Sequence, residues 1–405
     1  MGGPDMTALL DVDAARGLLL EGVAPLAAET TGLETARSRI LAQDVFACLT
    51  QPPFAASAMD GYAIRWADMP GPWRVVGEAA AGRGWPGAMA AGEAVRIFTG
   101  APVPTGADTV VVQEEITRCD AVAALHGDGP PRLGAHIRPM GQDFAAGDTM
   151  AVAGDRLTPA RIGVLAAAGH GAVPVVRRPR VTLLATGDEL VPPGSAPGPD
   201  QIVSSNTVML RALFESVGAL VDDPGIVPDR CEALAAALAG ATGDLIVTIG
   251  GASVGDHDLV VPVLREMGAD IDFWKIALRP GKPLLAGRLG GTRIIGLPGN
   301  PVSAYVCALL FAVPLLCRLG GRSDGLPMAA LPLAAPLPAN GPRRDYMRAR
   351  LTAEGTVEAF ASQDSGMLTR LASAQLLVVR QPGAPAARTG EIVDCIALDS
   401  IGDVS

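Results

Sequence analysis

Residues 244–258 read DLIVTIGGASVGDHD, and this stretch decides the fold class. It opens with an apolar run of the length expected for a strand that is buried on both faces, and glycines follow at once. Two other runs, 181–185 and 292–297, have the same composition. Helices are predicted over 207–217 and 302–317, so that buried strands and helices alternate. This alternation predicts a parallel sheet with helices on both faces.

Each of the three strands is followed by a loop rich in glycine and polar side chains. The loops read TGDE at 186–189, GGASVGDHD at 250–258 and PGNPVS at 298–303. Ligands bind at the carboxyl ends of strands in such sheets, and glycines let backbone N–H groups approach phosphate oxygens. Asn300 can cap the following helix with Pro301 in its first turn, a position that favours an anion. Together the loops predict a nucleotide or pterin-phosphate pocket, although any one alone is equally well a tight turn.

These loops lack the common nucleotide-binding motifs and carry carboxylates instead. None contains GxxxxGK[ST] or a clean GxGxxG, which disfavours a kinase or a nicotinamide-dependent dehydrogenase. Asp188, Glu189, Asp256 and Asp258 stand where phosphates are expected. Mg²⁺ takes one or two carboxylates beside a phosphate and completes its coordination with substrate oxygens. Ordinary turn and N-cap chemistry accounts for at least two of these carboxylates.

Lysine is nearly absent from the chain, and this makes its position informative. The net charge is −10, which argues against a general nucleic-acid binder, and only two of the 32 basic residues are lysines. Both fall in residues 273–283, FWKIALRPGKP, as Lys275 and Lys282. Lys275 and Arg279 would share one face of a strand, and Lys282 can fold back after the Pro-Gly turn. The segment predicts a local site for an anion, with a solvated strand face as the alternative.

The chain on either side of the β-rich region is predicted to be helical. A helix is predicted over 11–22 with Asp11 as its cap, and a second near Thr31 with Glu34 completing a capping box. Another is predicted over 158–169.

The other segments have sequence patterns that are typical of β-strands. Short alternating runs punctuated by proline and glycine predict a β-rich module from 51 to about 139. A proline-rich linker begins after 326, and strands are predicted over 376–380 and 391–397.

Nothing in the sequence predicts export or a membrane span. The N-terminus lacks a basic region before an apolar stretch. The longest apolar run, 304–317, is interrupted by Pro314 and is shorter than the ~20 residues that cross a bilayer. The six cysteines are scattered without a CxxC, which favours reduced thiols over a disulfide frame or a zinc site. We therefore predict a cytoplasmic protein.

Seven strings spread over the chain resemble one family. They read SAMDGYA (57–63), TGAPVP (99–104), RPMGQD (138–143), TGDEL (186–190), GGASVGDHD (250–258), RPGKP (279–283) and LPGNPVS (297–303). In this order they are similar to the molybdopterin molybdenumtransferases, the MoeA family, which is related to the E domain of gephyrin. The resemblance covers essentially the whole chain.

The resemblance implies a multidomain fold of α/β plus β class. Its parts are a helical linker domain (1–50 and 140–178), an inserted β-rich domain (51–139), a molybdopterin-binding α/β sandwich domain (179–326) and a C-terminal β-barrel-like domain (327–405). It also implies a homodimer whose cleft lies between the α/β domain of one subunit and the inserted domain of the other.

The family's reaction inserts molybdenum from molybdate into adenylyl-molybdopterin and releases AMP. The catalytic residues implied are Asp60, Thr99, Asp143, Glu189, Asp229, Asp258, Lys275 and Arg279, the last at a position where relatives often carry lysine. The substrate-binding residues implied are Arg138, Ser205, Gly250, Gly251, Ser253, Gly255, Asp256, Lys282, Pro298, Gly299, Asn300, Pro301, Ser303 and Ser365. Glu189 and Asp258 would hold Mg²⁺. A molybdopterin adenylyltransferase and molybdoenzyme-maturation proteins are expected partners, whereas nucleic acid and membranes are not.

Two other functions stay open at this stage. The α/β domain alone also resembles molybdopterin adenylyltransferases, so the chain could form the adenylate. The inserted domain and the tail argue against this, because simple adenylyltransferases lack them. A non-catalytic scaffold or cofactor chaperone is the third interpretation, and the intact set of polar loop residues makes it the weaker one.

Overall fold

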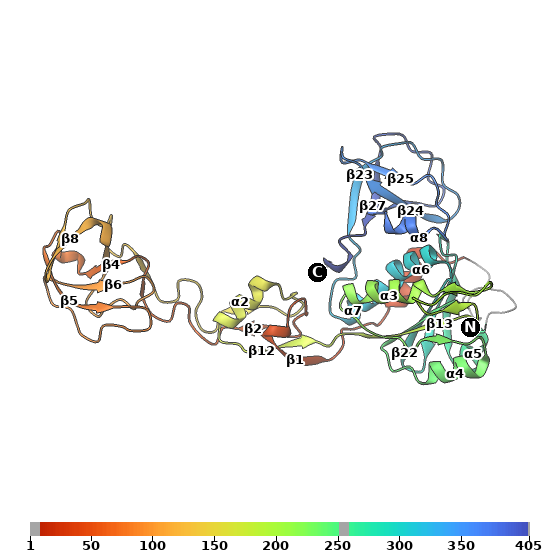
Figure 1. Cartoon of the computed structure of the whole chain (residues 1–405), viewed down its shortest axis with the longest axis horizontal. Helices are drawn as coiled ribbons and strands as arrows, with labels where there is room; N and C mark the ends of the chain where they lie inside the picture. The colour runs from red at the N-terminus through yellow and green to blue at the C-terminus, as the bar shows by residue number, and fades with distance from the viewer. Residues whose placement is uncertain (1–8, 251–258, 404–405) are drawn as a thin grey trace.

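The computed structural model describes residues 9–250 and 259–403, and the chain is elongated (Figure 1). A β-rich unit stands at one end and a narrow unit occupies the middle. An α/β unit and a second β-rich unit lie together at the other end. The outgoing and returning segments pair in the middle unit, where β1 (Ala28–Gly32) lies antiparallel to β12 (Ala172–Val176). This arrangement confirms the predicted multidomain α/β plus β fold.

The α/β unit is built on a sheet with strand order β16-β13-β18-β22-β21-β19, and β17 also pairs with β13. The strands are β13 (Arg180–Thr186), β16 (Leu220–Asp222), β17 (Ile226–Val227), β18 (Leu245–Ile249), β19 (Asp270–Lys275), β21 (Pro283–Leu289) and β22 (Thr292–Leu297). The strands from β16 to β22 in this order are parallel, as predicted. The far edge is antiparallel, so the prediction is wrong there. Only Gly290 and Gly291 join β21 to β22, and so short a connection fits antiparallel strands.

Helices cover both faces of this sheet. Leu183 and Leu184 are successive residues of β13 and point to opposite faces. Leu183 belongs to a core with α1, α3, α6 and α7, whereas Leu184 belongs to a core with α4 and α5. The helices are α1 (Val12–Leu20), α3 (Ser205–Ser216), α4 (Cys231–Ala239), α5 (Val260–Glu266), α6 (Pro301–Cys307) and α7 (Val313–Leu319).

Helix α1 forms as predicted but packs in an unexpected place. Asp11 caps it by accepting a hydrogen bond from the backbone N–H of Asp13 at 2.8 Å. Val12 and Leu19 are fully or almost fully buried in the α/β core. The helix therefore packs on the α/β unit, although the resemblance assigns it to the linker domain. The other domain limits stay predictions.

A long apolar helix runs through the core of the α/β unit. A π-helical turn, Ala308–Ala312, connects α6 to α7. It ends two residues before Pro314, whose missing N–H cannot complete an α-helical ladder. The whole helix, Pro301–Leu319, has 19 residues, which is longer than the apolar run 304–317 identified in the sequence. Its mean hydropathy is 2.0. It is nevertheless 83% buried, which is the behaviour of a core helix.

The middle unit contains less helix than predicted. α2 (Pro159–Ala167) confirms the helix expected there, and Thr158 caps it by accepting from the N–H of Arg161 at 3.3 Å. The helix predicted near Thr31 is wrong, because this segment forms β1 and only a short 3₁₀ turn, Leu33–Thr35, follows. The pairing of β1 with β12 overrides the local capping signal at Glu34.

The inserted unit is a sheet with strand order β7-β4-β6-β5-β9-β8, which confirms the predicted β-rich module. Trp73 and Ile64 are buried in its core. Beside it, β3 (Ala56–Ser57) pairs with β10 (Ile137–Arg138). The strands of the sheet are β4 (Gly61–Ile64), β5 (Trp73–Ala79), β6 (Glu93–Ile97), β7 (Thr109–Val112), β8 (Ile116–Cys119) and β9 (Val122–Leu125).

The C-terminal unit is a sheet with strand order β20-β24-β26-β27-β23, with β25 beside β24. β23 is Met328–Pro332 and β25 is Val357–Ala359. The strands predicted over 376–380 and 391–397 are confirmed as β26 (Leu376–Arg380) and β27 (Ile392–Ala397). β20 (Leu278–Arg279) is contributed by the α/β segment and pairs with β24 (Arg344–Leu351). The two units are therefore joined through shared strand pairing.

Candidate active site

The predicted pocket lies where β13, β18 and β22 end. A cavity of about 490 Å³ is bordered by Thr186 and Glu189 after β13, by Gly250 after β18 and by Asn300 after β22. An adjoining recess of about 120 Å³ shares Thr186, Glu189 and Gly250 and reaches Asp229. Gly250 has a φ of +86°, and a Cβ there would lie 3.1 Å from the Thr186 carbonyl oxygen. The structure thus brings together the loops that the sequence singles out.

Carboxylates gather at the recess. Burial raises the pKa of the Asp229 carboxyl, and the charges of Asp188 and Glu189 raise it further. Asp188 also accepts a hydrogen bond from the N–H of Asp229 at 3.1 Å, which ties the two loops together. Within 9–250 and 259–403, no three His, Cys, Asp or Glu side chains lie close enough to hold a metal by themselves. A Mg²⁺ ion here would need substrate oxygens, as it usually does.

Asn206 is a site residue that the sequence reasoning missed. It lies in the first turn of α3, and its Nδ2 donates to the Gly299 carbonyl at 2.7 Å. Its Oδ1 is buried and has no hydrogen-bond partner among the described residues. A buried amide oxygen beside a cavity can accept a hydrogen bond from a ligand N–H. Ser205, a predicted substrate-binding residue, lines the same cavity.

The loop that follows β22 starts α6 as predicted, with one difference. Asn300 occupies the N-cap position and Pro301 the first turn, but the Asn300 side chain forms no capping hydrogen bond within the described part of the chain. Gly299 and Pro301 line the cavity with Asn300, whereas Ser303 is buried in the first turn. Pro298 directly follows β22.

The basic segment differs in shape from the one predicted. β19 ends at Lys275, whereas Arg279 lies on β20 in the sheet of the C-terminal unit. The two side chains do not share a strand face, because the chain leaves the α/β sheet between them. Lys282 does return to Lys275: the Ile276 N–H donates to the Lys282 carbonyl at 3.1 Å. The two lysines are therefore close in the backbone, as expected.

The turn that carries Lys282 packs on the first turns of α6. A Cβ at Gly281 would collide with the sulfur of Cys307. The Val302 N–H donates to the Ser365 carbonyl at 3.2 Å, which brings the C-terminal loop to the same helix. Lys282 and Ser365, both predicted to bind substrate, thus reach the start of α6 from different units.

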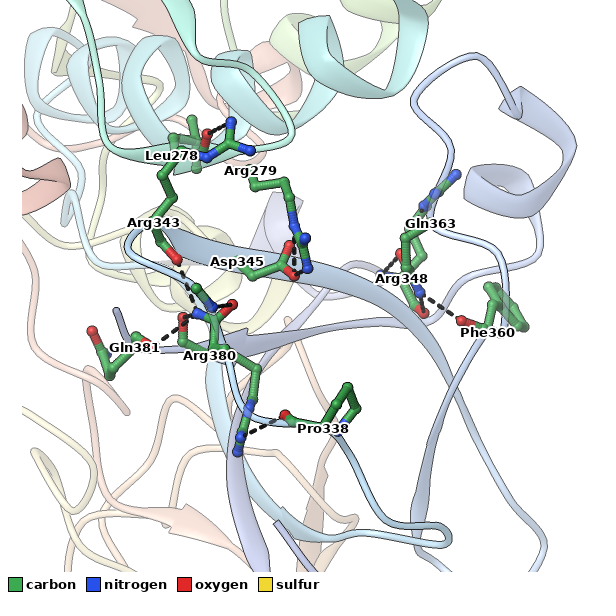
Figure 2. A network of polar contacts seen from close by, with 12 residues as sticks. Leu278, Arg279, Pro338, Arg343, Asp345, Arg348, Phe360, Gln363, Arg380 and Gln381 are labelled. Carbon is green, nitrogen blue, oxygen red and sulfur yellow. Dashed lines mark hydrogen bonds and ion pairs between the residues drawn. The ribbon is translucent and has the colours of Figure 1, made fainter. Parts of the chain in front are cut away.

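Gln363 fixes the loop that carries Ser365. Its Oε1 accepts from the backbone N–H of Arg348 at 2.9 Å, and its Nε2 donates to the Phe360 carbonyl at 2.9 Å (Figure 2). Arg348 is 1% exposed, and its Nε also donates to Gln363 at 3.2 Å. The sequence singles out Ser365 but gives no sign of this support, which comes from β24.

Arg279 joins the α/β unit to the C-terminal unit. Its guanidinium pairs with the carboxylate of Asp345 on β24 through Nε, at 2.9 Å, and through Nη2 (Figure 2). The hydrogen bond to Asp345 raises the pKa of Arg279 although burial opposes this. Asp345 is 2% exposed, so its charge depends on this partner. A lysine lacks the planar fork that both nitrogens use here, which gives a physical reason for arginine at this position.

We expect Arg279→Ala to lower the free energy of unfolding by about 1–3 kcal/mol, because the buried Asp345 carboxylate would lose its partner. The loss stays below that of a fully buried pair, since 53% of the Arg279 side chain is exposed. Arg350→Ala is the matched control: its pair with Glu358 is exposed on the same sheet, with an expected cost under about 1 kcal/mol. Urea unfolding followed by circular dichroism measures both, and equal losses would contradict the role of Asp345.

Asp60 and Thr99 form a pair in the inserted unit. Asp60 directly precedes β4, and its Oδ1 accepts from the backbone N–H of Thr99 at 2.7 Å and from its hydroxyl at 2.8 Å. These hydrogen bonds lower the pKa of Asp60, so the side chain is a carboxylate at neutral pH. A Cβ at Gly61 would collide with the Val111 carbonyl, so a glycine must follow Asp60.

Arg96 supports this pair and was not predicted. Its Nη1 donates to the Gly61 carbonyl at 2.7 Å, and its guanidinium lies over the rings of Phe98 and Tyr62 at 4.5 and 5.2 Å. The positive charge of Arg96 also lowers the pKa of Asp60. The only sequence signal is a charged residue inside an alternating strand, which is usually solvated.

The residues of the inserted unit stand apart from the cavity within one chain. Arg138 lies on β10 and its backbone pairs with Ala56, while Asp143 donates its N–H to the Gln51 carbonyl at 3.0 Å. The inserted unit and the α/β unit occupy opposite ends of the molecule (Figure 1). Asp60, Thr99, Arg138 and Asp143 are therefore not brought to Glu189 by folding of one chain. The predicted residues Gly251, Ser253, Gly255, Asp256 and Asp258 lie outside the described residues.

Comparisons with known proteins match this architecture part by part. Residues 10–169 match the MoeA N-terminal region (domain I and II), residues 182–318 a "Probable molybdopterin binding domain" and residues 330–398 the MoeA C-terminal region (domain IV). A MoeA protein of known structure from Pyrococcus horikoshii superposes with a TM-score of 0.84 at 28% identity, covering 96% of this chain and 99% of that one.

Named relatives agree with these matches. The molybdopterin molybdenumtransferase of Haemophilus influenzae is 37% identical over 327 residues, which is 78% of this chain and 79% of the relative. Molybdopterin molybdenumtransferase 2 of Mycobacterium tuberculosis is 38% identical over 365 residues, which is 86% of this chain and 90% of the relative.

The chain has a cavity at the carboxyl edge of a largely parallel sheet, three further structural units and a match to a molybdopterin binding domain, which together define a multidomain enzyme of molybdopterin metabolism. The relatives specify it further: the chain belongs to the MoeA family, which confirms the resemblance found in the sequence.

Proposed function

We propose that the chain inserts molybdenum from molybdate into adenylyl-molybdopterin and releases AMP. The observation that carries this is the cavity at the ends of β13, β18 and β22, which borders the start of α6, the helix that both the lysine turn and the Ser365 loop contact. The cavity suits the pterin and its phosphates, and the two lysines supply positive charge for an oxyanion and the dithiolene. The names of the relatives support the same reaction.

We propose further that the active cleft is completed in a homodimer. Asp60, Thr99 and Arg138 lie in the inserted unit, and Asp143 lies where this unit joins the middle unit, hydrogen-bonded to Gln51. The inserted unit and the α/β unit, which carries Glu189 and Lys282, stand at opposite ends of the molecule (Figure 1). A second copy can bring its inserted unit to the cavity, as the family resemblance implies. In such a cleft the Asp60 carboxylate can accept a proton from, or orient, a water near the scissile phosphoanhydride bond.

The recess at Asp229 fits a magnesium ion in part. Among the described residues, Glu189 is the carboxylate that lines both the cavity and the recess. Asp229 is repelled by the negative charges of Asp188 and Glu189, and a bound cation would reduce this repulsion. We propose that Glu189, with Asp258, holds Mg²⁺, which would supply charge neutralisation to the phosphates. The chain's own residues then bind the pterin through Asn206 and the 298–303 loop.

We expect EDTA to stop AMP release and Mg²⁺ to restore it. Glu189→Gln should raise the Mg²⁺ concentration for half-maximal activity at least about tenfold, because one anionic ligand is lost. Glu232→Gln, an exposed glutamate on α4, is the matched control. The same Mg²⁺ dependence in both variants would rule out Glu189 as a ligand.

One experiment separates this proposal from the adenylyltransferase and scaffold alternatives. The purified protein is mixed with adenylyl-molybdopterin, with and without molybdate. The proposal expects AMP and a cofactor that reconstitutes an apo-molybdoenzyme, both dependent on molybdate. Pyrophosphate release from ATP and molybdopterin would support the adenylyltransferase, and no turnover of either kind would support the scaffold. A molybdopterin adenylyltransferase and maturation proteins as partners, and a cytoplasmic location, belong to the same proposal.

A further inference from the structure

A second cavity, of about 480 Å³, lies where the middle unit meets the α/β unit. None of its lining residues belongs to the candidate active site. Six arginines line it, and Glu215 is the one carboxylate among its described lining residues. The arginines are Arg37, Arg39, Arg156, Arg177, Arg178 and Arg322. So much charge of one sign in one concavity is unusual for a chain of net charge −10.

Two of these guanidinium groups converge on Gly218. Arg178 donates from Nε to the Gly218 carbonyl at 2.8 Å and from Nη2 to the Ala219 carbonyl at 3.0 Å. Arg322 Nη2 lies 3.2 Å from the place a Cβ on Gly218 would take. Gly218 has a φ of +91°, a conformation that favours glycine in the turn after α3. The missing side chain also leaves room for the Arg322 guanidinium.

The charges of Arg178 and Arg322 are held by neutral oxygens. Arg322 Nη2 donates to the Ser38 carbonyl at 3.0 Å, and its Nη1 is buried without a hydrogen-bond partner in the described part of the chain. By contrast, carboxylates neutralise two of the other arginines: Asp244 pairs with Arg177 through bonds of 2.9 and 2.8 Å, and Glu29 pairs with Arg39. Burial lowers the pKa of Arg322, and neighbouring arginines lower it further. Arg178 and Arg322 are therefore ordered guanidinium groups that no ion pair neutralises in the described part of the chain.

We propose that this cavity binds a small tetrahedral dianion of the phosphate and molybdate class. Guanidinium groups recognise such oxyanions through paired N–H donors. Ser38 comes from the middle unit, whereas Arg178, Gly218 and Arg322 come from the α/β unit. A bound dianion therefore bridges the two units and fixes the direction in which the middle unit carries the inserted domain. This proposal does not depend on the reaction proposed above.

Isothermal titration calorimetry on the full chain tests the site, with sodium phosphate in one arm and sodium molybdate in the other. Sodium chloride at matched ionic strength is the reference, since chloride is not tetrahedral. We expect one dianion per chain at this cavity, and we expect it to be retained in Lys282→Ala, which removes a lysine of the proposed active site. Arg322→Gln should weaken binding at least about tenfold, as should Arg178→Gln. Glu215→Gln should tighten it about threefold, because it removes the single carboxylate.

Arg118→Gln, on exposed strand β8, controls for loss of a distant positive charge and should bind as the wild type does. Glu215 is exposed, so Glu215→Gln should fold normally. It therefore tests the binding site even if the arginine variants do not fold. Wild-type affinity in both Arg322→Gln and Glu215→Gln would overturn the proposal. It would also be overturned if the wild type bound no dianion. If, in addition, Arg322→Gln turned a dimer into a monomer by light scattering, the cavity would be a contact between copies. The cavity would then hold a carboxylate of a second copy.

Discussion

Lys275→Ala is expected to abolish molybdenum insertion while the fold stays intact. Arg279 pairs with the buried Asp345 carboxylate, and in the proposed function Lys275 and Lys282 supply the positive charge of the basic turn to the oxyanion. Losing a preorganised positive donor at developing or transferring charge costs about 10²–10³ in rate. Lys275 is half-buried at the end of β19, and the hydrogen bond that its backbone carbonyl accepts from the Leu10 N–H, at 3.0 Å, is kept in the alanine variant. Molybdate-dependent AMP release and reconstitution of an apo-molybdoenzyme measure the loss.

A matched control lies on the same hairpin. Arg288 is exposed on β21, which pairs with β19, and Arg288→Ala removes one positive charge without touching the turn. It should keep near-wild-type activity, and thermal melts of the two variants should coincide with the wild type. Wild-type insertion by a folded Lys275→Ala protein would remove Lys275 from the site.

The α/β fold could be predicted because its signals are local. Apolar runs such as 245–249 and the glycine-rich loops after them depend on neighbours in sequence, and the structure places three of these loops at one cavity. The capping box at Glu34 is also a local signal, but the helix that it predicts does not form. There, β12 arrives from about 140 residues later and pairs with the segment, a contact that no window of sequence contains.

Support for the site could not be predicted for the same reason. Gln363 matters because β24 presents the backbone of Arg348 to it, and Arg279 matters because Asp345 is buried opposite. In the sequence Asn206 is an ordinary polar residue at the start of a helix. Its role depends on α3 lying beside the 298–303 loop, where it donates to the Gly299 carbonyl. Sequence motifs thus identify most of the residues around the cavity. The residues that support them act through tertiary contacts, which the sequence does not show.

Asp60→Asn is expected to reduce the rate of AMP release about 10²–10⁴-fold, which is the range for losing a group that accepts or positions a proton. The hydrogen bonds from Thr99 lower the pKa of Asp60, so the wild-type group is a carboxylate and cannot donate a proton at neutral pH. The amide keeps the size of the side chain but loses the charge. Asp128→Asn, at an exposed position of the same unit, should be silent.

Mixing two inactive variants tests whether the cleft is shared between subunits. Asp60 directly precedes β4 in the inserted unit and Lys275 ends β19 in the α/β unit, and these units stand at opposite ends of one chain (Figure 1). Each site of a homodimer would therefore take one group from each copy. When Asp60→Asn and Lys275→Ala chains exchange subunits at equal amounts, half of the dimers are mixed. Each mixed dimer has one site with both residues intact, so about a quarter of wild-type activity should return. If each site drew both residues from one chain, every site would lack one of them and no activity would return. Recovery in proportion to the mixed dimers, counted by native mass spectrometry, therefore establishes the shared cleft, and its absence in a confirmed mixed dimer excludes it.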